Sequence, residues 1–357
     1  MRPGQHHLES LDAFRGLTIA GMILVNNPGN WDTVYAPLVH AEWNGCTLAD
    51  LVYPFFLVIL GVALPFALAR RRESGHEMHR VHARIVRRSV LLFALGFVLN
   101  LVAAQFSFAT VRIPGVLQRI ALVYFAAALI TLHGSRRVRA AAAVALVLAH
   151  WFVLTLAPMT PRATIAAQID HAVFGRHLLL PTYDPEGLLG TLSAIASALI
   201  GTLAGDWLRA ASPDARPMTN VLSAGALLAV VGLLWSVVLP INKPLWTGSY
   251  AAFTGGLALL ALAACYIGIE IVGVRAWARP FVWLGVNPLA IYFLAELVAH
   301  IIELTPVKTT LYWGLLRPLV LHRLSEPGIS LLFAVITVGV WTAVAGVLYR
   351  RDIRIQV

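Results

Sequence analysis

The sequence predicts an all-α fold, a polytopic integral membrane bundle of about ten transmembrane helices forming a single domain over residues 1–357. Apolar residues make up 59% of the 357 residues and charged residues only 12%, whereas a soluble domain is about 25% charged. The mean hydropathy is +0.77. Apolar residues also gather in runs of about 17–25, the length of a helix that crosses a bilayer. The chain is therefore expected to lie in the lipid bilayer, and a disordered chain or a secreted soluble enzyme is excluded.

The candidate spans follow one another along the whole chain. We expect helices over residues 11–25, 51–69, 89–106, 114–132, 140–157, 188–208, 221–239, 250–272, 281–302 and 331–349. The first is short and carries Asp12 and Arg15, which sit at i, i+3 and predict an internal salt bridge. The run 311–321 is brief and contains Arg317 followed by Pro318, so we interpret it as interfacial or re-entrant.

Basic residues set the orientation of these spans. Most of the 27 Lys and Arg residues fall in alternate connections, on the side that also carries both termini. Such clusters face the cytoplasm, so we expect both termini to be cytoplasmic. This distribution accounts for the net charge of +10 without a nucleic-acid partner. Residues 1–9 lack the pattern of a removable signal peptide.

A polar segment, residues 26–49, joins the first two spans and contains Asn26 and His40. Imidazole has a pKa of about 6.5, so His40 can take a proton from a nucleophile near neutrality. Asn26 can stabilise an oxyanion. The alternative is that His40 caps an interfacial loop. Cys46 is a rival nucleophile, with only the distant His40 as a basic partner.

Further polar residues lie at or near membrane depth, where they are costly unless they have a function. Gln118 and Arg119 begin the fourth span and face either a cavity or a carboxylate such as Asp50 or Glu296. Glu296 shares a face of the ninth span with Tyr292, at i, i+4. His76, His79 and His82 lie in a basic loop without carboxylate or thiolate partners, so no metal site is expected there.

Two outer loops carry side chains that suit a polar, sugar-like ligand: Asp184 and Glu186 in one, and Asn242, Lys243 and Trp246 in the other. Asp184-Pro-Glu-Gly is equally a turn sequence, and Trp246 is equally an interfacial anchor. The residues alone leave both interpretations open.

Six ordered motifs between about residues 11 and 296 resemble the heparan-alpha-glucosaminide N-acetyltransferase family of transmembrane acyltransferases. They are LDAFRG at 11–16, HAEWNG at 40–45, ADLVYPF at 49–55, RIPGVLQR at 112–119, YDPEGLLGT at 183–191 and NKPLW at 242–246. The resemblance implies transfer of an acetyl group from cytosolic acetyl-CoA to the amine of a glucosamine-like sugar on the outer side. No metal is implied, and a homodimer is expected.

The resemblance also assigns roles to residues. His40 is implied as the catalytic histidine, a general base or acyl carrier, and Asn26 as its partner. For the acceptor we expect Trp43, Asn44, Asp50, Asp184, Glu186, Asn242, Lys243 and Trp246. For acetyl-CoA we expect Arg15, Gln118, Arg119, Asn287, Tyr292, Arg87 and Arg88, with Arg70, Arg71 and Arg72 also on the basic inner rim that holds the phosphates.

This sequence departs from the lysosomal enzyme in lacking its N-terminal luminal domain and preceding helix, and in a shorter loop 158–187 without cysteines. We therefore expect a bacterial-type inner-membrane relative that acts on a smaller amino sugar or an envelope glycan. Two alternatives remain. One is a transporter of a polar solute, lined by Gln118, Arg119, Tyr292 and Glu296; the other is an O-acetyltransferase of an envelope glycan.

Overall fold

The structure is a computed structural model that describes residues 8–73, 77–209 and 216–355, apart from the side chains of 70–73, 216 and 217. Every regular element in these residues is helical, which confirms the predicted all-α class. The chain divides into two compact units, which are described separately. Unit 1 comprises residues 1–39 and 260–356, and unit 2 comprises residues 40–259 and 357. The prediction of a single membrane domain stays a prediction.

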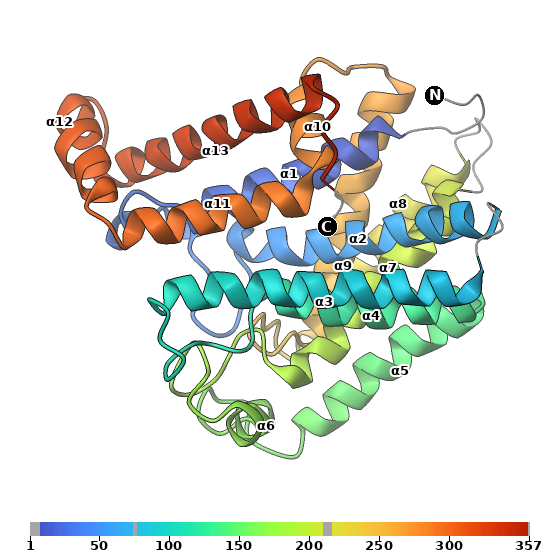
Figure 1. Cartoon of the computed structure of the whole chain (residues 1–357). Coiled ribbons are helices and arrows are strands. Elements are labelled where there is room, and N and C mark those ends of the chain that lie inside the picture. Colours follow the sequence, from blue (N-terminus) through green and yellow to red (C-terminus); the bar gives the residue numbers. More distant parts are fainter. Residues whose placement is uncertain (1–7, 74–76, 210–215, 356–357) are drawn as a thin grey trace. The chain divides into compact units, whose positions relative to one another are not determined.

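Unit 2 is built from long helices joined by connections of unequal length (Figure 1). They are α2 (Leu48–Glu73), α3 (Met78–Ala103), α4 (Val116–His133), α5 (Arg136–Leu154), α6 (Ile165–Phe174), α7 (Leu188–Arg209), α8 (Arg216–Trp235) and the first part of α9 (Gly248–Tyr266). The short helix α6 lies within the connection 158–187, and the Thr164 hydroxyl caps it by accepting from the Ala167 N–H at 3.0 Å.

Helix α7 is the centre of unit 2, because α2, α4, α5, α6 and α8 all pack against it. Small residues allow the closest of these approaches, between α7 and α2. A Cβ atom on Gly201 would lie 2.0 Å from the Val58 carbonyl oxygen, and one on Gly61 would lie 1.9 Å from the Ala198 carbonyl oxygen. Small residues bring helix backbones together in the same way in membrane bundles generally.

Unit 1 combines the start and the end of the chain. Its elements are α1 (Glu9–Asn26), η1 (Trp31–Thr33), η2 (Ala36–Leu38), the end of α9, η3 (Ile267–Ile271), α10 (Arg279–Val286), α11 (Pro288–Glu303), η4 (Thr309–Leu316), α12 (Arg317–Val320) and α13 (Glu326–Arg350). Helix α1 packs closely against α10: a Cβ atom on Gly16 would lie 1.7 Å from the Phe281 carbonyl oxygen. The stretch interpreted as interfacial or re-entrant forms η4 and α12, which are helical and largely exposed.

The expected ninth span is broken, which corrects the prediction of one helix over residues 281–302. Helices α10 and α11 meet at 86°, at the step from Asn287 to Pro288. Proline lacks the N–H that would continue the α10 ladder. The Asn287 side chain takes over part of that bonding, because its Nδ2 donates to the Ile353 carbonyl at 2.9 Å and its Oδ1 accepts from the Ile355 N–H at 2.8 Å.

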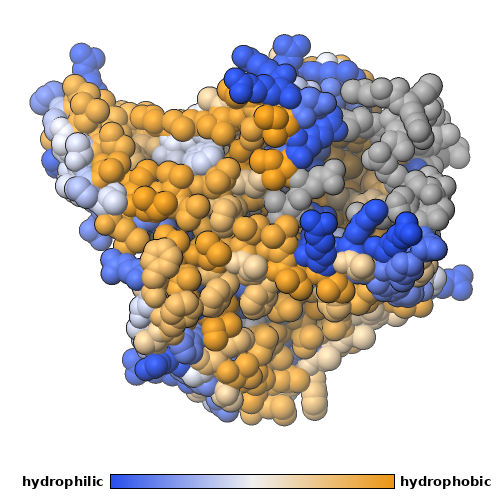
Figure 2. Space-filling view, viewed as in Figure 1, coloured by the Kyte–Doolittle hydropathy of each residue, from blue (hydrophilic) through white to orange (hydrophobic). Residues whose placement is uncertain are grey.

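Within the described residues, eight helices are long and apolar enough to cross a membrane, or up to nine if the bent pair is one span. These eight match eight of the ten expected spans. The remaining expected span is helix α1, which carries Glu9, Asp12 and Arg15 and falls outside this set. Exposed valine, leucine and phenylalanine side chains along α3 and α5 give the face in Figure 2 its hydrophobic surface, as expected for contact with lipid.

Candidate active site

His40 and Asp50 form a hydrogen-bonded pair at the start of α2. The His40 Nδ1 atom lies 2.8 Å from the Asp50 Oδ1 atom. The Asp50 carboxylate can only accept, so Nδ1 carries the proton and Nε2 keeps its lone pair. The Asp50 side chain is 1% exposed whereas that of His40 is 46% exposed. A buried carboxylate therefore orients an accessible imidazole base, the arrangement used to activate nucleophiles.

The start of α2 fixes the Asp50 carboxylate in place. Asp50 Oδ2 accepts from the Thr47 N–H at 3.0 Å, the Thr47 hydroxyl at 3.1 Å and the Ala41 N–H at 3.1 Å. An acidic side chain that returns to the N–H three residues earlier is half of a capping box. The Tyr250 hydroxyl also donates to the Asp50 carbonyl at 2.6 Å. The Thr47-x-x-Asp50 spacing is the sequence signal for this restraint.

Lys243 completes a triad with this pair. Its Nζ atom lies 3.3 Å from Asp50 Oδ1, 2.9 Å from His40 Nδ1 and 3.2 Å from His40 Nε2. Because Nζ is at nearly equal distances from the two ring nitrogens, the amine lies over the face of the imidazole and not in line with the Nε2 lone pair, which lies in the ring plane. Burial lowers the pKa of Lys243, although the Asp50 and Glu186 charges oppose that shift. An amine therefore packs against the imidazole ring.

Two loops hold this triad together. Asn242 Nδ2 donates to Asn44 Oδ1 at 3.1 Å, and the Gly45 N–H donates to the Ile241 carbonyl at 2.8 Å. Gly45 has a φ of +114°, a conformation that glycine adopts without strain. Asn242 Oδ1 accepts in turn from the Leu245 N–H at 2.8 Å. The structure thus joins the loop of Asn44 to the loop of Asn242 and Lys243, and the predicted role of these residues in binding an acceptor stays a prediction.

Arg112 forms ion pairs with Asp184 and Glu186, the two carboxylates that were expected to contact the acceptor. Its Nε donates to Asp184 Oδ2 at 2.8 Å, and its Nη2 contacts both Asp184 and Glu186. Asp184 also accepts from the Leu179 and Glu186 N–H groups, both at 2.9 Å. Burial raises the pKa of Glu186, but the charges of Arg112, Arg119 and Lys243 outweigh burial and leave it lowered. Arg112, which sequence reasoning did not assign a role, secures this turn.

Arg119 is buried with part of its guanidinium unused. Its side chain is 1% exposed, Nη2 donates to the Gly187 carbonyl at 2.9 Å, and the guanidinium carbon lies 5.3 Å from the Trp246 ring centre. Among the described residues its Nε and Nη1 atoms have no hydrogen-bond partner, and neither has Gln118 Nε2. Arg119 is hydrogen-bonded to a backbone carbonyl, so the alternative of an ion pair with Asp50 is not found.

Trp246 is a core residue, which corrects its interpretation as an interfacial anchor. Its side chain is 0% exposed and packs edge-on against Tyr53 and Tyr250. Its indole N–H donates to the Ser197 hydroxyl at 3.1 Å. It contacts the site by packing beneath Arg119.

Asn26, the other predicted catalytic residue, belongs to unit 1, so its placement against His40 stays a prediction. Asn26 Nδ2 donates to Glu296 Oε1 at 2.9 Å. In the same unit Arg15 Nη1 pairs with Asp12 Oδ1 at 3.0 Å, which confirms the predicted internal salt bridge. Tyr292 is buried in α11.

The residues expected to bind acetyl-CoA are divided between the units. Arg15, Asn287 and Tyr292 lie in unit 1, and Arg87, Arg88, Gln118 and Arg119 lie in unit 2. On α3, Arg87 is exposed, and the Arg88 guanidinium carbon lies 4.5 Å from the Tyr124 ring centre. The side chains of Arg70, Arg71 and Arg72 lie outside the described residues.

Two further candidate sites are the Cys46 thiol and the histidines of the basic loop. Burial raises the pKa of Cys46 to about 12, which keeps its sulfur as an unreactive thiol. In the part of the chain that the structure describes, no group of three or more His, Cys, Asp or Glu side chains could hold a metal ion. His82 Nε2 lies 2.8 Å from His133 Nε2, whereas His76 lies outside the described residues.

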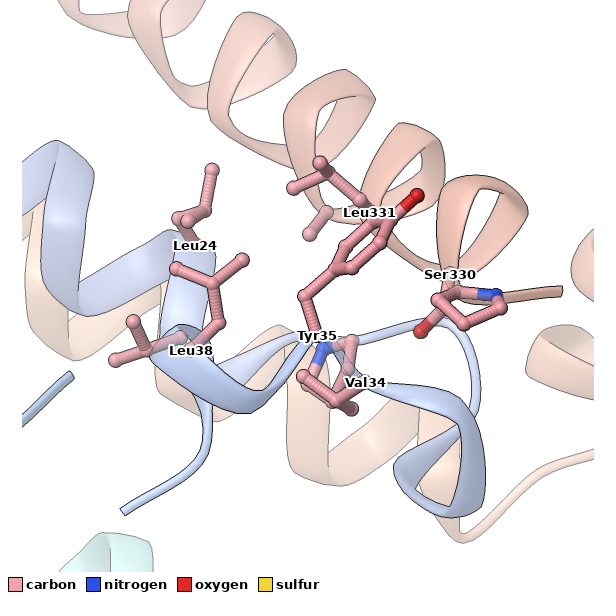
Figure 3. Close-up of a pocket in the computed structure, with 10 residues that line it drawn as sticks. Leu24, Val34, Tyr35, Leu38, Ser330 and Leu331 are labelled. Atoms are coloured by element: carbon pink, nitrogen blue, oxygen red, sulfur yellow. The ribbon is translucent and has the colours of Figure 1, made fainter. Parts of the chain in front are cut away.

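Unit 1 contains a small apolar pocket that is not part of the predicted site (Figure 3). It is lined by Leu24, Val34, Tyr35, Leu38 and Leu331, with Ser330 at one side. None of the predicted catalytic or ligand-binding residues lines this pocket.

The chain is similar in sequence to known proteins. Residues 8–179 match the family model described as heparan-alpha-glucosaminide N-acetyltransferase, catalytic. The chain is 28% identical to the human heparan-alpha-glucosaminide N-acetyltransferase over 352 residues, 80% of this chain and 52% of the human protein. It is 27% identical to the mouse protein of that name over 363 residues, 84% of this chain and 55% of the mouse protein. The chain thus spans about half the length of these relatives, and it is similar to the heparan-alpha-glucosaminide N-acetyltransferase family over residues 8–179.

Proposed function

We propose that the protein is a membrane acetyltransferase that moves the acetyl group of cytosolic acetyl-CoA to the amine of a glucosamine-like sugar on the outer side. The observation that carries this proposal is the His40–Asp50 pair, in which a buried carboxylate orients an accessible imidazole through Nδ1. The names of the human and mouse relatives support an acetyl transfer to a glucosaminide nitrogen.

Acyl transfer to an amine requires that a proton leave the nucleophile as it attacks the thioester carbonyl. His40 Nε2 takes that proton, and Asp50 stabilises the imidazolium that forms. The imidazolium then protonates the departing thiolate of coenzyme A. A direct transfer uses His40 as a general base; if Nε2 instead attacks first, it carries the acetyl group.

The oxyanion of the tetrahedral intermediate needs hydrogen-bond donors. In this proposal Asn26 supplies its second amide N–H, since the first is held by Glu296. Lys243 stabilises the negative charge that builds up at the same centre.

The acceptor sugar is proposed to bind over the loop that contains His40. The Trp43 and Tyr183 ring centres lie 5.0 Å apart with their planes at 71°, and Trp43 Nε1 is fixed to the Met159 carbonyl at 3.0 Å. Such rings present apolar faces with polar edges, which suits the two sides of a pyranose. Asn44 and Asn242 offer amide groups beside them. Asp184 and Glu186 act indirectly, by holding the turn through Arg112.

The donor is proposed to enter from the arginine-rich ends of the helices, where Arg87 and Arg88 bind the phosphates of coenzyme A. Its pantetheine arm then runs into the bundle, and the unpaired nitrogens of Gln118 and Arg119 meet its carbonyl oxygens. Arg15, Asn287 and Tyr292 would contact the same arm from unit 1. We further propose a homodimer in a bacterial-type inner membrane with both termini in the cytoplasm.

The test is acetyl transfer by the purified protein in lipid nanodiscs, with labelled acetyl-CoA and glucosamine. We expect N-acetylglucosamine to form, and His40→Ala to reduce its rate to the uncatalysed level. His322→Ala, in an exposed turn of unit 1, is the matched control and should behave as wild type. A hydroxyl-only sugar should not be acetylated; if it is, the protein is an O-acetyltransferase. Solute uptake without any acetylation would overturn the proposal in favour of transport.

A further inference from the structure

One primary amine of the chain packs against the imidazole that acts as the base in the proposed reaction. Lys243 Nζ lies over the His40 ring, 2.9 Å from Nδ1 and 3.2 Å from Nε2, the nitrogen proposed to remove a proton. The lysine is anchored there by Asp50 and by the loop bond between Asn44 and Asn242. An amine acceptor for which His40 is the base has to come within hydrogen-bond distance of the same Nε2.

The chain contains a natural control for this position. Its sequence has only two lysines, Lys243 and Lys308. Lys308 Nζ lies 2.6 Å from Glu303 Oε1, in unit 1, and no imidazole among the described residues has a recorded contact with it. Both lysines are paired with a carboxylate, and Lys243 alone of the two also contacts a histidine.

We propose that Lys243 is itself acetylated by acetyl-CoA when no sugar occupies the site. This inference rests on the proposed function, because the thioester must reach His40. The burial that lowers the pKa of Lys243 enlarges the fraction of unprotonated, nucleophilic amine. Proximity also raises the rate of acetylation, since the amine is part of the chain and does not have to be bound.

The step balances without any further reactant. The Lys243 ammonium releases one proton to water, and the resulting amine attacks the acetyl carbonyl carbon. The new C–N bond forms, His40 Nε2 takes a second proton from the nitrogen, and the C–S bond breaks. The thiolate accepts that second proton from His40 and leaves as the free thiol of coenzyme A.

The product is a stable amide, so it cannot pass the acetyl group on to a sugar. Acetylation removes the positive charge that lies 3.3 Å from Asp50 and places a larger neutral group beside His40. The modified enzyme is therefore inactive. A bound sugar fills the site and protects it, so the modification reports that acetyl-CoA is present without acceptor.

The experiment incubates the full-length protein in nanodiscs with acetyl-CoA and quantifies acetyl groups on both lysines by peptide mass spectrometry. We expect Lys243 to be modified at least about tenfold faster than Lys308. Glucosamine should suppress the modification of Lys243 and leave that of Lys308 unchanged. Activity toward glucosamine should fall in proportion to the modified fraction of Lys243. His40→Ala should bring the rate at Lys243 down to that at Lys308.

Variants and parallel assays separate the possible failures. Lys243→Arg keeps the cation beside Asp50 and offers no primary amine, so the activity that this variant retains should no longer decline with time in acetyl-CoA. Equal modification of the two lysines, or sugar acetylation with an unmodified Lys243, overturns this inference while the proposed function stands. If neither the sugar nor Lys243 is acetylated, the proposed function fails and this inference fails with it.

Discussion

Asp50 accepts hydrogen bonds from the Thr47 and Ala41 N–H groups through Oδ2, while Oδ1 faces His40. Oδ2 therefore fixes the carboxylate to the backbone, and Oδ1 fixes the tautomer of the imidazole. The proton on Nδ1 is what leaves Nε2 free to act as a base.

The first prediction concerns Asp50→Asn. The two backbone N–H groups will hold the amide oxygen, so the amide NH2 will face His40 Nδ1 and force the proton onto Nε2. We expect kcat for sugar acetylation to fall on the order of 10³-fold with little change in KM. Steady-state kinetics measure it, and Asp32→Asn, in an exposed turn of unit 1, is the matched control. An Asp50→Asn enzyme with wild-type kcat would contradict the assigned role.

The second prediction concerns Asp170, a buried carboxyl that accepts from the Leu188 N–H at 2.9 Å. Burial raises its pKa to about 6, above the unfolded value of about 3.9. Its contribution to stability is therefore complete at acid pH and is lost as the pH rises through about 6.

From about pH 4.5 to about pH 7.5 we expect wild type to lose on the order of 2 kcal/mol of unfolding free energy relative to Asp170→Asn. The asparagine keeps an acceptor for Leu188 and cannot ionise. Thermal unfolding of both proteins across this pH range measures the difference. Parallel curves would show that Asp170 titrates normally.

At the level of elements, α2 and α7 approach so closely that their glycines face backbone carbonyls. Helix α7 is largely buried by its neighbours, and this contact fixes its position along α2. Its first residue, Leu188, follows the Asp184–Gly187 turn. The position of that turn, and of the Arg119 bond to Gly187, thus depends on helix packing some distance away.

The third prediction concerns Gly201→Ala. A Cβ atom 2.0 Å from the Val58 carbonyl oxygen forces the two backbones apart, so we expect a loss of about 1–3 kcal/mol of stability. Gly339→Ala in α13 is the matched control, since a Cβ atom there meets nothing within 4 Å. The midpoint of thermal unfolding in one detergent compares them. Equal midpoints would mean that α2 and α7 can separate without cost.

At the level of the whole molecule, the alternation of basic connections predicts which helix ends face the cytoplasm. Met78 begins α3 next to an arginine-rich stretch, and Thr110 follows the other end of the same helix. Both residues are exposed.

The fourth prediction is therefore a labelling pattern. In a background with Cys46 and Cys265 replaced by alanine, a membrane-impermeant maleimide should label Thr110→Cys in intact cells. Met78→Cys should be labelled only after permeabilisation. The reverse pattern would invert the topology and place acetyl-CoA on the wrong side for the proposed reaction.

The sequence by itself determined the all-α class and most of the spans, because twenty apolar residues in a row have few stable alternatives in lipid. It also predicted His40, Asp50 and Lys243 as site residues, through the resemblance that their motifs carry. Tertiary structure decided how their side chains lie. Lys243 is some 200 residues from His40, and the packing of the helices, which local patterns do not encode, brings its amine to the imidazole. Packing likewise buried Trp246 and paired Asp184 and Glu186 with Arg112. It left Arg119 Nε and Nη1 without a hydrogen-bond partner among the described residues.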